Sequence, residues 1–208
     1  MGYNHLGEHI KAASVDPLVA LKDVERVRRY FLTNYKQGPL YGLVWTLGCN
    51  MGLRVGDILQ LKAGQLMNQT HLTLIESKTG KQRTIYINDR CSRWIKAYFA
   101  QYLFFEPQAQ ICRGKKGWIL QNKALHKLIK HTCRELKIDG NYGTHTMRKT
   151  FAYHAYTATL DLSLVQNILN HSEKHVTRSY VGKNVIINSD PNLMRQMSHD
   201  EVYAALDL

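Results

Sequence analysis

The chain has 208 residues, and 44% of them are hydrophobic, so it can form one well-filled core and at most a small appendage. Its 28 Lys and Arg residues against 16 Asp and Glu residues leave a formal charge of +12, which favours a polyanionic partner, either nucleic acid or an acidic membrane face. No apolar run is long enough to span a bilayer, and the N-terminus lacks the apolar stretch of a signal peptide. We therefore expect a cytoplasmic protein that binds DNA or RNA and has no membrane partner.

The first predicted element is a helix within residues 15–35. Asp16 is placed to cap it, and Pro17 suits a first helical turn. Its apolar stripe consists of Leu18, Leu21, Val24, Val27 and Phe31. Three arginines cluster in the same segment: Arg26, Arg28 and Arg29. They form either a solvated basic face or a face that meets DNA.

Further helices and one hairpin follow along the chain. A helix is predicted after Pro39, and another over 54–62. Apolar residues then alternate with polar ones on either side of "KTGKQ" within residues 71–88, a pattern that predicts a β-hairpin. Helical patterns return over 91–104 and 123–137, and the latter has its basic residues facing outward. Between them, "RGKKG" is a basic loop that either meets phosphates or keeps a turn in solvent.

The last third of the chain also reads as helical. A helix is predicted from "GTHTMRKTFAYH", with Thr144 as its cap, and a shorter one over 163–170. Ser198 and Glu201 have the spacing of a capping box for a final helix. The sum is one mainly α domain with a small antiparallel β-sheet, an α+β fold that covers residues 16–208 behind a tail at 1–15.

Two segments combine an arginine with a second polar side chain three residues away. His145 and Arg148 project to one side of a helix near its N-terminus, where the dipole and free amides favour an anion. Arg54 stands at a Gly-rich helix entrance in "NMGLRVGDILQLK", and Asp57 is placed to brace its guanidinium. Each pair alone is equally consistent with ordinary surface or structural contacts.

Two more segments bring a lysine, a histidine and a tyrosine. Lys78 stands at the mouth of the hairpin in "SKTGKQRTIYI". The segment "LNHSEKHVTRSYVG" presents His171 and, nine residues later, Tyr180. Taken alone, Lys78 is consistent with an ordinary charged turn, and Tyr180 with a tyrosine that packs against the protein.

Taken together, the four segments resemble the tyrosine recombinase family, also called the phage integrase family, from about residue 16 to the end. The family's "GLR.sE" resembles the segment around Arg54, with Asp57 in the acidic place, and its "GKG.KeR" hairpin is matched by "KTGKQR". Its "H.LRhtfat" and "LGHs....t..Y" segments are similar to "HTMRKTFAYH" and "LNHSEKHVTRSY". Two departures are Asn170, where the family generally has Gly, and "SKTG" in place of "GKG".

The resemblance implies the tyrosine recombinase catalytic-domain fold and a site-specific recombinase, which cleaves and rejoins DNA through a 3′-phosphotyrosine during integration, excision or inversion. Tyr180 is then the nucleophile. Arg54 and Arg148 are permanently charged, fork-shaped groups that suit the non-bridging phosphate oxygens without a metal.

The same resemblance gives roles to the other three members of the implied catalytic set. Lys78 protonates the departing 5′-oxygen, His145 accepts the tyrosine proton and His171 hydrogen-bonds the phosphate. The remaining histidines show no ligand spacing, so no metal or cofactor is implied. The cysteines show no CxxC pair and are expected to be reduced, buried packing residues: Cys49, Cys91, Cys112 and Cys133.

Basic residues outside the catalytic set are candidates for DNA contacts: Arg26, Arg28, Arg29, Lys81, Arg83, Arg113, Lys115, Lys116 and Lys149. The resemblance also implies double-stranded DNA as partner, a homo-oligomer that is a tetramer on DNA, accessory DNA-bending proteins, and a nucleoid-associated protein of bacterial, phage or mobile-element origin. The terminal segment, about 190–208, docks either on a neighbouring protomer or on its own domain.

Two other functions stay open at this point. A type IB topoisomerase uses related chemistry to relax supercoils, and a non-catalytic DNA-binding protein on the same fold would need to lack a catalytic residue, whereas all six are present. Many members carry a separate core-binding domain, whereas about fifteen residues precede the matched region here. The chain is therefore either a catalytic fragment or a short enzyme similar to the DNA invertases that flip fimbrial promoters.

Overall fold

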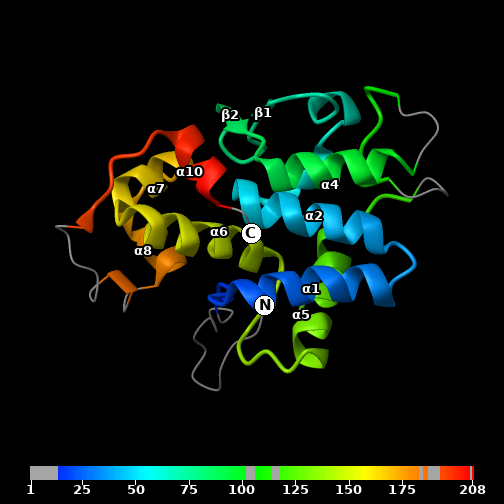
Figure 1. Cartoon of the computed structure of the whole chain (residues 1–208), viewed down its shortest axis with the longest axis horizontal. Coiled ribbons are helices and arrows are strands. Elements are labelled where there is room, and N and C mark those ends of the chain that lie inside the picture. Colours follow the sequence, from blue (N-terminus) through cyan, green and yellow to red (C-terminus); the bar gives the residue numbers. More distant parts are fainter. Residues whose placement is uncertain (1–13, 102–105, 114–117, 183–184, 187–192, 207) are drawn as a thin grey trace, which may run out of the picture.

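The computed structural model describes residues 14–101, 106–113, 118–182, 185–186, 193–206 and 208. They form a helical body that carries a two-stranded antiparallel sheet, so the predicted fold class is confirmed (Figure 1). The helices before the sheet are α1 (Leu21–Asn34), α2 (Gly38–Met51), α3 (Val55–Gln60) and the 3₁₀ turn η1 (Ala63–Gln65). The strands are β1 (His71–Ile75) and β2 (Gln82–Tyr86). The later helices are α4 (Asp89–Phe99), α5 (Asn122–Glu135), α6 (Thr144–Thr159), α7 (Leu162–Ile168), α8 (Lys174–Val181) and α10 (His199–Ala205).

Helix α2 lies in the middle of the body because it is apolar on nearly every face. It packs against α1, α4 and α6, and almost all of its side chains are buried. Helix α1 has the amphipathic pattern of a covering helix, and its inward stripe includes Val24, Val27 and Phe31. The indole of Trp45 on α2 donates to the carbonyl of Val24 at 3.0 Å. The two helices therefore meet through buried apolar side chains and a buried hydrogen bond.

The start of α1 differs from the prediction. The helix begins at Leu21 rather than near Asp16, and its N-cap residue is Ala20. Asp16 instead binds the loop before α6: its amide donates to the carbonyl of Asn141 at 2.7 Å, and its carboxylate accepts from the amide of Asn141 at 2.8 Å. The capping role predicted for Asp16 was wrong, because its backbone amide and carboxylate bind this distant loop instead of the helix.

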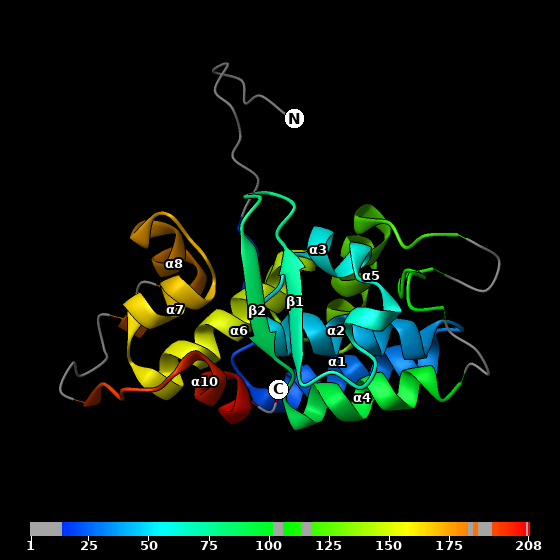
Figure 2. The same ribbon diagram turned by 90° about the horizontal axis from the view of Figure 1, so that it is seen from above.

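The hairpin has the predicted alternation. Leu72 is paired with Ile85 and Leu74 with Arg83, and all of these side chains face the interior. In the view of Figure 2 the hairpin lies between α7 and α8 on one side and α3 and α5 on the other. Its turn therefore projects between the two halves of the body.

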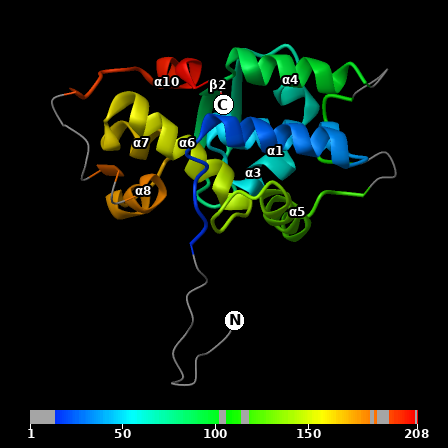
Figure 3. The ribbon, with the colours of Figure 1, turned by 60° about the horizontal axis from the view of Figure 1, so that its bottom comes forward.

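Helix α6 joins those two halves. Helices α7, α8 and α10 gather at one end of the molecule, and α1, α2, α4 and α5 lie toward the other (Figure 1, Figure 3). Gly143 rather than Thr144 is the N-cap residue, and its amide donates to Thr146 Oγ1 at 3.1 Å. Because α6 contacts helices on both sides, even its charged residues Arg148 and Lys149 are buried.

The terminal helix α10 packs on β2 and α6 of its own chain. The predicted capping box is present, with Glu201 N donating to Ser198 Oγ at 3.3 Å and Ser198 N donating to Glu201 Oε2 at 2.6 Å. Val202 and Tyr203 are buried. Exchange of this segment with a neighbouring protomer stays a prediction.

The cysteines have the packing role that the sequence predicts, since all four are buried. Burial raises the pKa of Cys112 and of Cys133 to about 12, which leaves these thiols protonated and unreactive. Within the described residues, no helix combines the length and the apolar character needed to cross a bilayer.

Candidate active site

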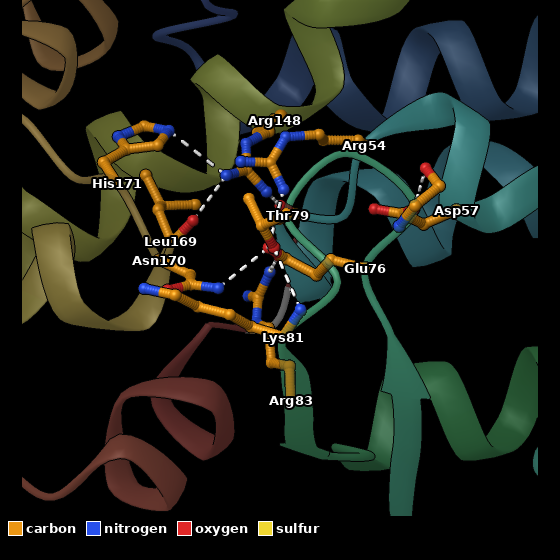
Figure 4. A network of polar contacts seen from close by, with 12 residues as sticks. Arg54, Asp57, Glu76, Thr79, Lys81, Arg83, Arg148, Leu169, Asn170 and His171 are labelled. Carbon is orange, nitrogen blue, oxygen red and sulfur yellow. Dashed lines mark hydrogen bonds and ion pairs between the residues drawn. The ribbon is translucent and has the colours of Figure 1, made fainter.

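The two predicted catalytic arginines converge next to the hairpin turn. Arg54 is the extended residue immediately before α3, and Arg148 lies on the second turn of α6 (Figure 4). The chain reaches Arg54 through Gly52, which ends α2 in the left-handed region at φ 58°. The carbonyl of Gly52 accepts a hydrogen bond from Arg148 Nη1, so the Gly-rich entrance positions both arginines.

Arg148 is buried and held by the backbone. Its Nη2 donates to the carbonyl of Leu169 at 2.6 Å and to His171 Nε2 at 3.1 Å. Its Nε is buried and makes no hydrogen bond with any described residue. Burial, and then the charges of Arg83 and Arg54, lower the pKa of Arg148, but a guanidinium still keeps its proton at neutral pH. The site thus concentrates positive charge that the protein only partly neutralises.

The carboxylate of Glu76 lies among these arginines with no exposure to solvent. Its Oε2 pairs with Arg54 Nη1 at 2.9 Å, and its Oε1 pairs with Arg83 Nη1 at 3.4 Å. Although burial alone would raise the pKa of Glu76, hydrogen bonds and the charge of Arg54 lower it overall. Glu76 was not among the site residues predicted from the sequence. The period of two that turns Leu74 inward also turns Glu76 inward, and this was the available signal.

Asp57 does not brace Arg54 as the sequence predicted. Its Oδ1 accepts from the amide of Ser77 at 2.9 Å and from the hydroxyl of Ser77 at 2.6 Å. Arg54 has extended backbone angles outside the helix, so the neighbourhood of residues three apart on a helix does not apply to this pair. Asp57 instead fixes the beginning of the hairpin turn against α3.

The departure at Asn170 has a structural explanation. Its φ is 52°, in the left-handed region that glycine adopts freely and that Asn tolerates better than most residues. Its Nδ2 donates to Glu76 Oε2 at 2.9 Å. Asparagine therefore keeps the turn and adds a contact that glycine could not make.

His171 joins the arginines to Tyr180. Its Nδ1 lies 3.0 Å from Thr177 Oγ1, and its ring meets that of Tyr180 edge to face with centroids 4.9 Å apart. Burial and the charge of Arg148 lower the pKa of His171 to about 3, so the ring is neutral at physiological pH. Since Arg148 can only donate, Nε2 must accept, and Nδ1 carries the proton that is donated to Thr177.

The nucleophile candidate Tyr180 is half-buried on α8, in the same chain as the arginines. The ammonium of Lys149 lies 5.5 Å from the centre of its ring and donates to the carbonyl of Ser179 at 3.1 Å. Because His171 contacts both Arg148 and the Tyr180 ring, the phenol ring lies near the arginine cluster of its own chain.

The last two predicted catalytic residues lie at the surface. His145 is exposed in the first turn of α6, and the protein around its ring, together with the charge of Arg148, lowers its pKa. The neutral form, which can accept a proton, is therefore favoured. Lys78 is exposed in the hairpin turn, next to Ser77 and Thr79, whose side chains are held by Asp57 and Glu76. Of the six predicted catalytic residues, the structure thus brings four together: Arg54, Arg148, His171 and Tyr180. His145 and Lys78 lie at the exposed surface.

Three of the predicted DNA contacts are corrected by the structure. Arg28 is 1% exposed, donates to Thr46 Oγ1 at 3.0 Å and also binds Glu25 and the carbonyl of Leu208. It faces α2 because it follows Val27 and Val24 on the covered side of α1. It therefore stabilises the interior instead of meeting DNA.

Arg83 and Lys149 are interior for the same kind of reason. Arg83 takes an inward position of β2 and donates to Tyr203 Oη at 2.8 Å and to the carbonyl of Met51 at 3.0 Å. Lys149 on α6 is 7% exposed, and it donates to Ser14 Oγ at 2.7 Å. Neither side chain is placed to meet a DNA surface.

Other basic residues keep an exposed position. Arg29, Lys81 and Arg113 are exposed, and Arg26 is exposed although it pairs with Asp23. Lys115 and Lys116 fall outside the described residues. The sequence did not single out the basic row on and just after α5, where these side chains are exposed: Lys123, Lys127, Lys130, Arg134 and Lys137. Four of them line a cleft between the end of α5 and the loop that follows.

The sequence of the chain is similar to those of known proteins. The sequence model of the phage integrase family matches residues 22–185. The chain is 32% identical over 168 residues to the probable integrase/recombinase YoeC of Bacillus subtilis (strain 168). The aligned region covers 81% of this chain and 90% of YoeC. It is 29% identical over 201 residues to tyrosine recombinase XerC of Caldanaerobacter subterraneus, covering 86% of this chain and 55% of XerC. The chain thus spans about half the length of that XerC relative.

Solved structures show the same fold. XerA recombinase superposes with a TM-score of 0.66 at 16% identity, over 84% of this chain and 62% of XerA. A lambda integrase dimer bound to a COC′ core site superposes with a TM-score of 0.62 at 14% identity, over 84% of this chain and 50% of the integrase. At these identities the likeness concerns the fold, and it confirms the recombinase catalytic-domain architecture.

Proposed function

The chain belongs to the phage integrase family, and on that premise we propose that it is a site-specific recombinase that cleaves and rejoins DNA through a 3′-phosphotyrosine. The observation that carries the proposal is the convergence of Arg54 and Arg148 with His171, whose ring contacts Tyr180. Arg54 precedes α3, Arg148 lies on α6 and Tyr180 on α8, so local structure does not account for the arrangement. A phosphodiester is an anion that this excess positive charge suits.

The proposed first step follows from the positions of these side chains. The hydroxyl oxygen of Tyr180 attacks the scissile phosphorus, the bond to the 5′-oxygen breaks, and a phosphotyrosine remains. Arg54 and Arg148 stabilise the charge that develops on the non-bridging oxygens, which is worth several kcal/mol, or about a hundredfold or more in rate for each contact. Both guanidinium groups are already held in place by protein contacts, so little reorganisation is needed.

Proton transfers complete the step. We assign acceptance of the Tyr180 proton to His145, whose neutral form is favoured, and protonation of the leaving 5′-oxygen to Lys78 in the hairpin turn. His171 was expected to hydrogen-bond the phosphate, but its two ring nitrogens lie at hydrogen-bonding distance from Arg148 and Thr177. In this scheme it therefore orients Arg148 and the Tyr180 ring instead. Attack by a 5′-hydroxyl from another strand reverses the step and exchanges strands.

The proposed substrate is double-stranded DNA, and the proposed assembly is a homo-oligomer, a tetramer on DNA. XerH in solved structures is bound to difH substrate, and lambda integrase forms a dimer on its core site. The formal charge of +12 and the exposed basic row of α5 support binding to a polyanion. Nucleoid association and accessory DNA-bending proteins belong to the same proposal. Because the relatives described above carry integrase and recombinase names, we propose strand exchange rather than supercoil relaxation.

A covalent-trapping experiment tests the proposal. A duplex that binds the Tyr180→Phe protein is first selected from a random library and is then nicked to make a suicide substrate. We expect wild-type protein to form a covalent adduct and Tyr180→Phe to form none, with EDTA having no effect because arginines supply the positive charge. Tyr153→Phe, which removes a hydroxyl from a half-buried tyrosine of α6, should react like wild type. An undiminished adduct in Tyr180→Phe would give the nucleophile's role to another residue.

A second assay separates recombination from topoisomerase activity. Plasmids that carry two copies of the selected sequence should yield recombinant products. Relaxation of plasmids with equal efficiency in the presence and absence of the selected sequence, without recombinants, would refute site-specific recombination.

A further inference from the structure

We propose that Glu76 is a positioning residue of the recombination site, which holds Arg54 in place and, through Asn170, fixes the loop that carries His171. The inference rests on the function proposed above. It concerns a residue that lies outside the four segments by which the sequence resembles its family, and it gives the unusual Asn170 a purpose.

Four segments of the chain contact the carboxylate of Glu76 (Figure 4). Its partners are Arg54 Nη1 at 2.9 Å, Arg83 Nη1 at 3.4 Å, Thr79 Oγ1 at 2.9 Å and Asn170 Nδ2 at 2.9 Å. They come from the entrance of α3, from β2, from the hairpin turn and from the loop after α7. Three of these segments carry a predicted catalytic residue: Arg54, Lys78 and His171. Glu76 therefore connects parts of the site that are otherwise remote in sequence.

The charge around Glu76 is strongly positive. The guanidinium groups of Arg54 and Arg83 both pair with Glu76, and their charges also lower the pKa of the buried Arg148. Glu76 offsets part of their repulsion from inside the cluster, where the low local dielectric makes the attraction strong. A buried carboxylate without such partners would be costly, and this one has an ion pair with Arg54 and three hydrogen-bond donors. Net positive charge still remains for a phosphate.

Each residue of the loop at 169–171 contacts Arg148 or Glu76. The carbonyl of Leu169 and the ring of His171 accept from Arg148, and the side-chain amide of Asn170 donates to Glu76. A glycine at φ 52° would satisfy the backbone equally well but would leave the Glu76 side of the loop unattached. Asn170 thus ties the loop to the hairpin before DNA arrives.

A positioning role and a blocking role predict opposite results. If Glu76 merely occupied the place of a phosphate, removal of its charge would tighten DNA binding and also accelerate cleavage. If it positions Arg54 and the loop, removal of the charge leaves binding undiminished, since the site becomes more positive, but slows the chemical step. Displacement of a catalytic group by about 1 Å is enough to cost about a hundredfold in rate.

The experiment uses the full chain and the selected nicked duplex, and it measures the dissociation constant and the single-turnover cleavage rate separately. We expect Glu76→Gln to cleave about a hundredfold more slowly at saturating DNA, with an undiminished affinity. Asn170→Gly should cleave about three- to tenfold more slowly, and the double variant should be no slower than Glu76→Gln alone, because both changes break one linkage. Glu173→Gln, which removes an exposed carboxylate from the same region, serves as the matched control and should stay near the wild-type rate.

If Glu76→Gln folds poorly, Asn170→Gly still tests the inference. Glycine adopts the positive φ of this position without strain, so the unfolding temperature of the Asn170→Gly protein should not fall for that reason. A wild-type cleavage rate in either variant, or a faster one in Glu76→Gln, would overturn the inference. If the effects of Glu76→Gln and Asn170→Gly on the free energy of unfolding are strictly additive, the two side chains do not interact. This measurement does not depend on whether the protein is active. If the wild-type protein forms no adduct, the proposed function fails first, so the two failures are distinguishable.

Discussion

Replacement of Gly52 by alanine should damage both stability and catalysis, since this glycine is crowded and its carbonyl binds a catalytic arginine. Its φ of 58° lies in the left-handed region, which costs an alanine about 1–2 kcal/mol. A Cβ atom there would lie 2.5 Å from Cδ1 and 2.8 Å from Cγ of Phe151, and 3.0 Å from Cδ2 of Leu169. Phe151 is fully buried, so its ring cannot move away freely.

Overpacking of a filled core adds about 1–3 kcal/mol to the backbone cost, so Gly52→Ala should lower the free energy of unfolding by about 2–5 kcal/mol. For a chain of this size, that corresponds to a fall of roughly 5–15 °C in the unfolding temperature. The carbonyl of Gly52, displaced by the new methyl group, would also leave Arg148 Nη1. We therefore expect cleavage to slow more than DNA binding weakens.

Gly80→Ala is the matched control for the thermal measurement. Its φ of 67° imposes the same kind of backbone strain, but a Cβ atom there meets no described atom within 4 Å. Thermal unfolding should show a small shift for Gly80→Ala, from backbone strain of about 1–2 kcal/mol alone, and a shift at least twice as large for Gly52→Ala. Equal shifts would refute the reasoning that Phe151 and Leu169 close the space around Gly52.

Three further predictions concern the ionisable groups. Lys149→Met should slow single-turnover cleavage about tenfold, because the Tyr180 ring and the end of α8 lose their cation, and a wild-type rate would refute this positioning role. His171 has a folded-state pKa below that of the unfolded chain, so it contributes stability at neutral pH that is lost as the pH falls below about 6.5, with a slope under about 1.4 kcal/mol per pH unit. Chemical unfolding between pH 4 and 7 should therefore be less pH-dependent in His171→Asn, and identical pH profiles would contradict the cause given for the shift. Arg28→Ala should lower the free energy of unfolding by about 3 kcal/mol or more, while Arg29→Ala changes it by less than about 0.5 kcal/mol, and similar values for both would mean that Arg28 is not the interior residue described above.

The elements that were predicted correctly depend on local patterns. Alternation over residues 71–88 was enough to recognise the hairpin, and the capping box at Ser198 and Glu201 was enough to place the last helix. The predictions that failed, such as Asp16 as a cap and Asp57 as the partner of Arg54, assumed that a polar group binds its neighbours in sequence. Both groups bind distant residues instead.

The sequence by itself determined the family, the fold class and the identity of the six candidate catalytic residues, since these depend on side-chain type, order and spacing along the chain. Only the tertiary structure decided which charged residues are covered. Arg28, Arg83 and Lys149 resemble the exposed basic residues in composition and local context, but packing of α1, β2 and α6 on other elements buries them. Burial and the choice of an ion-pair partner depend on contacts between remote segments, and for that reason the meeting of Arg54 and Asn170 at Glu76 became visible only in the folded chain.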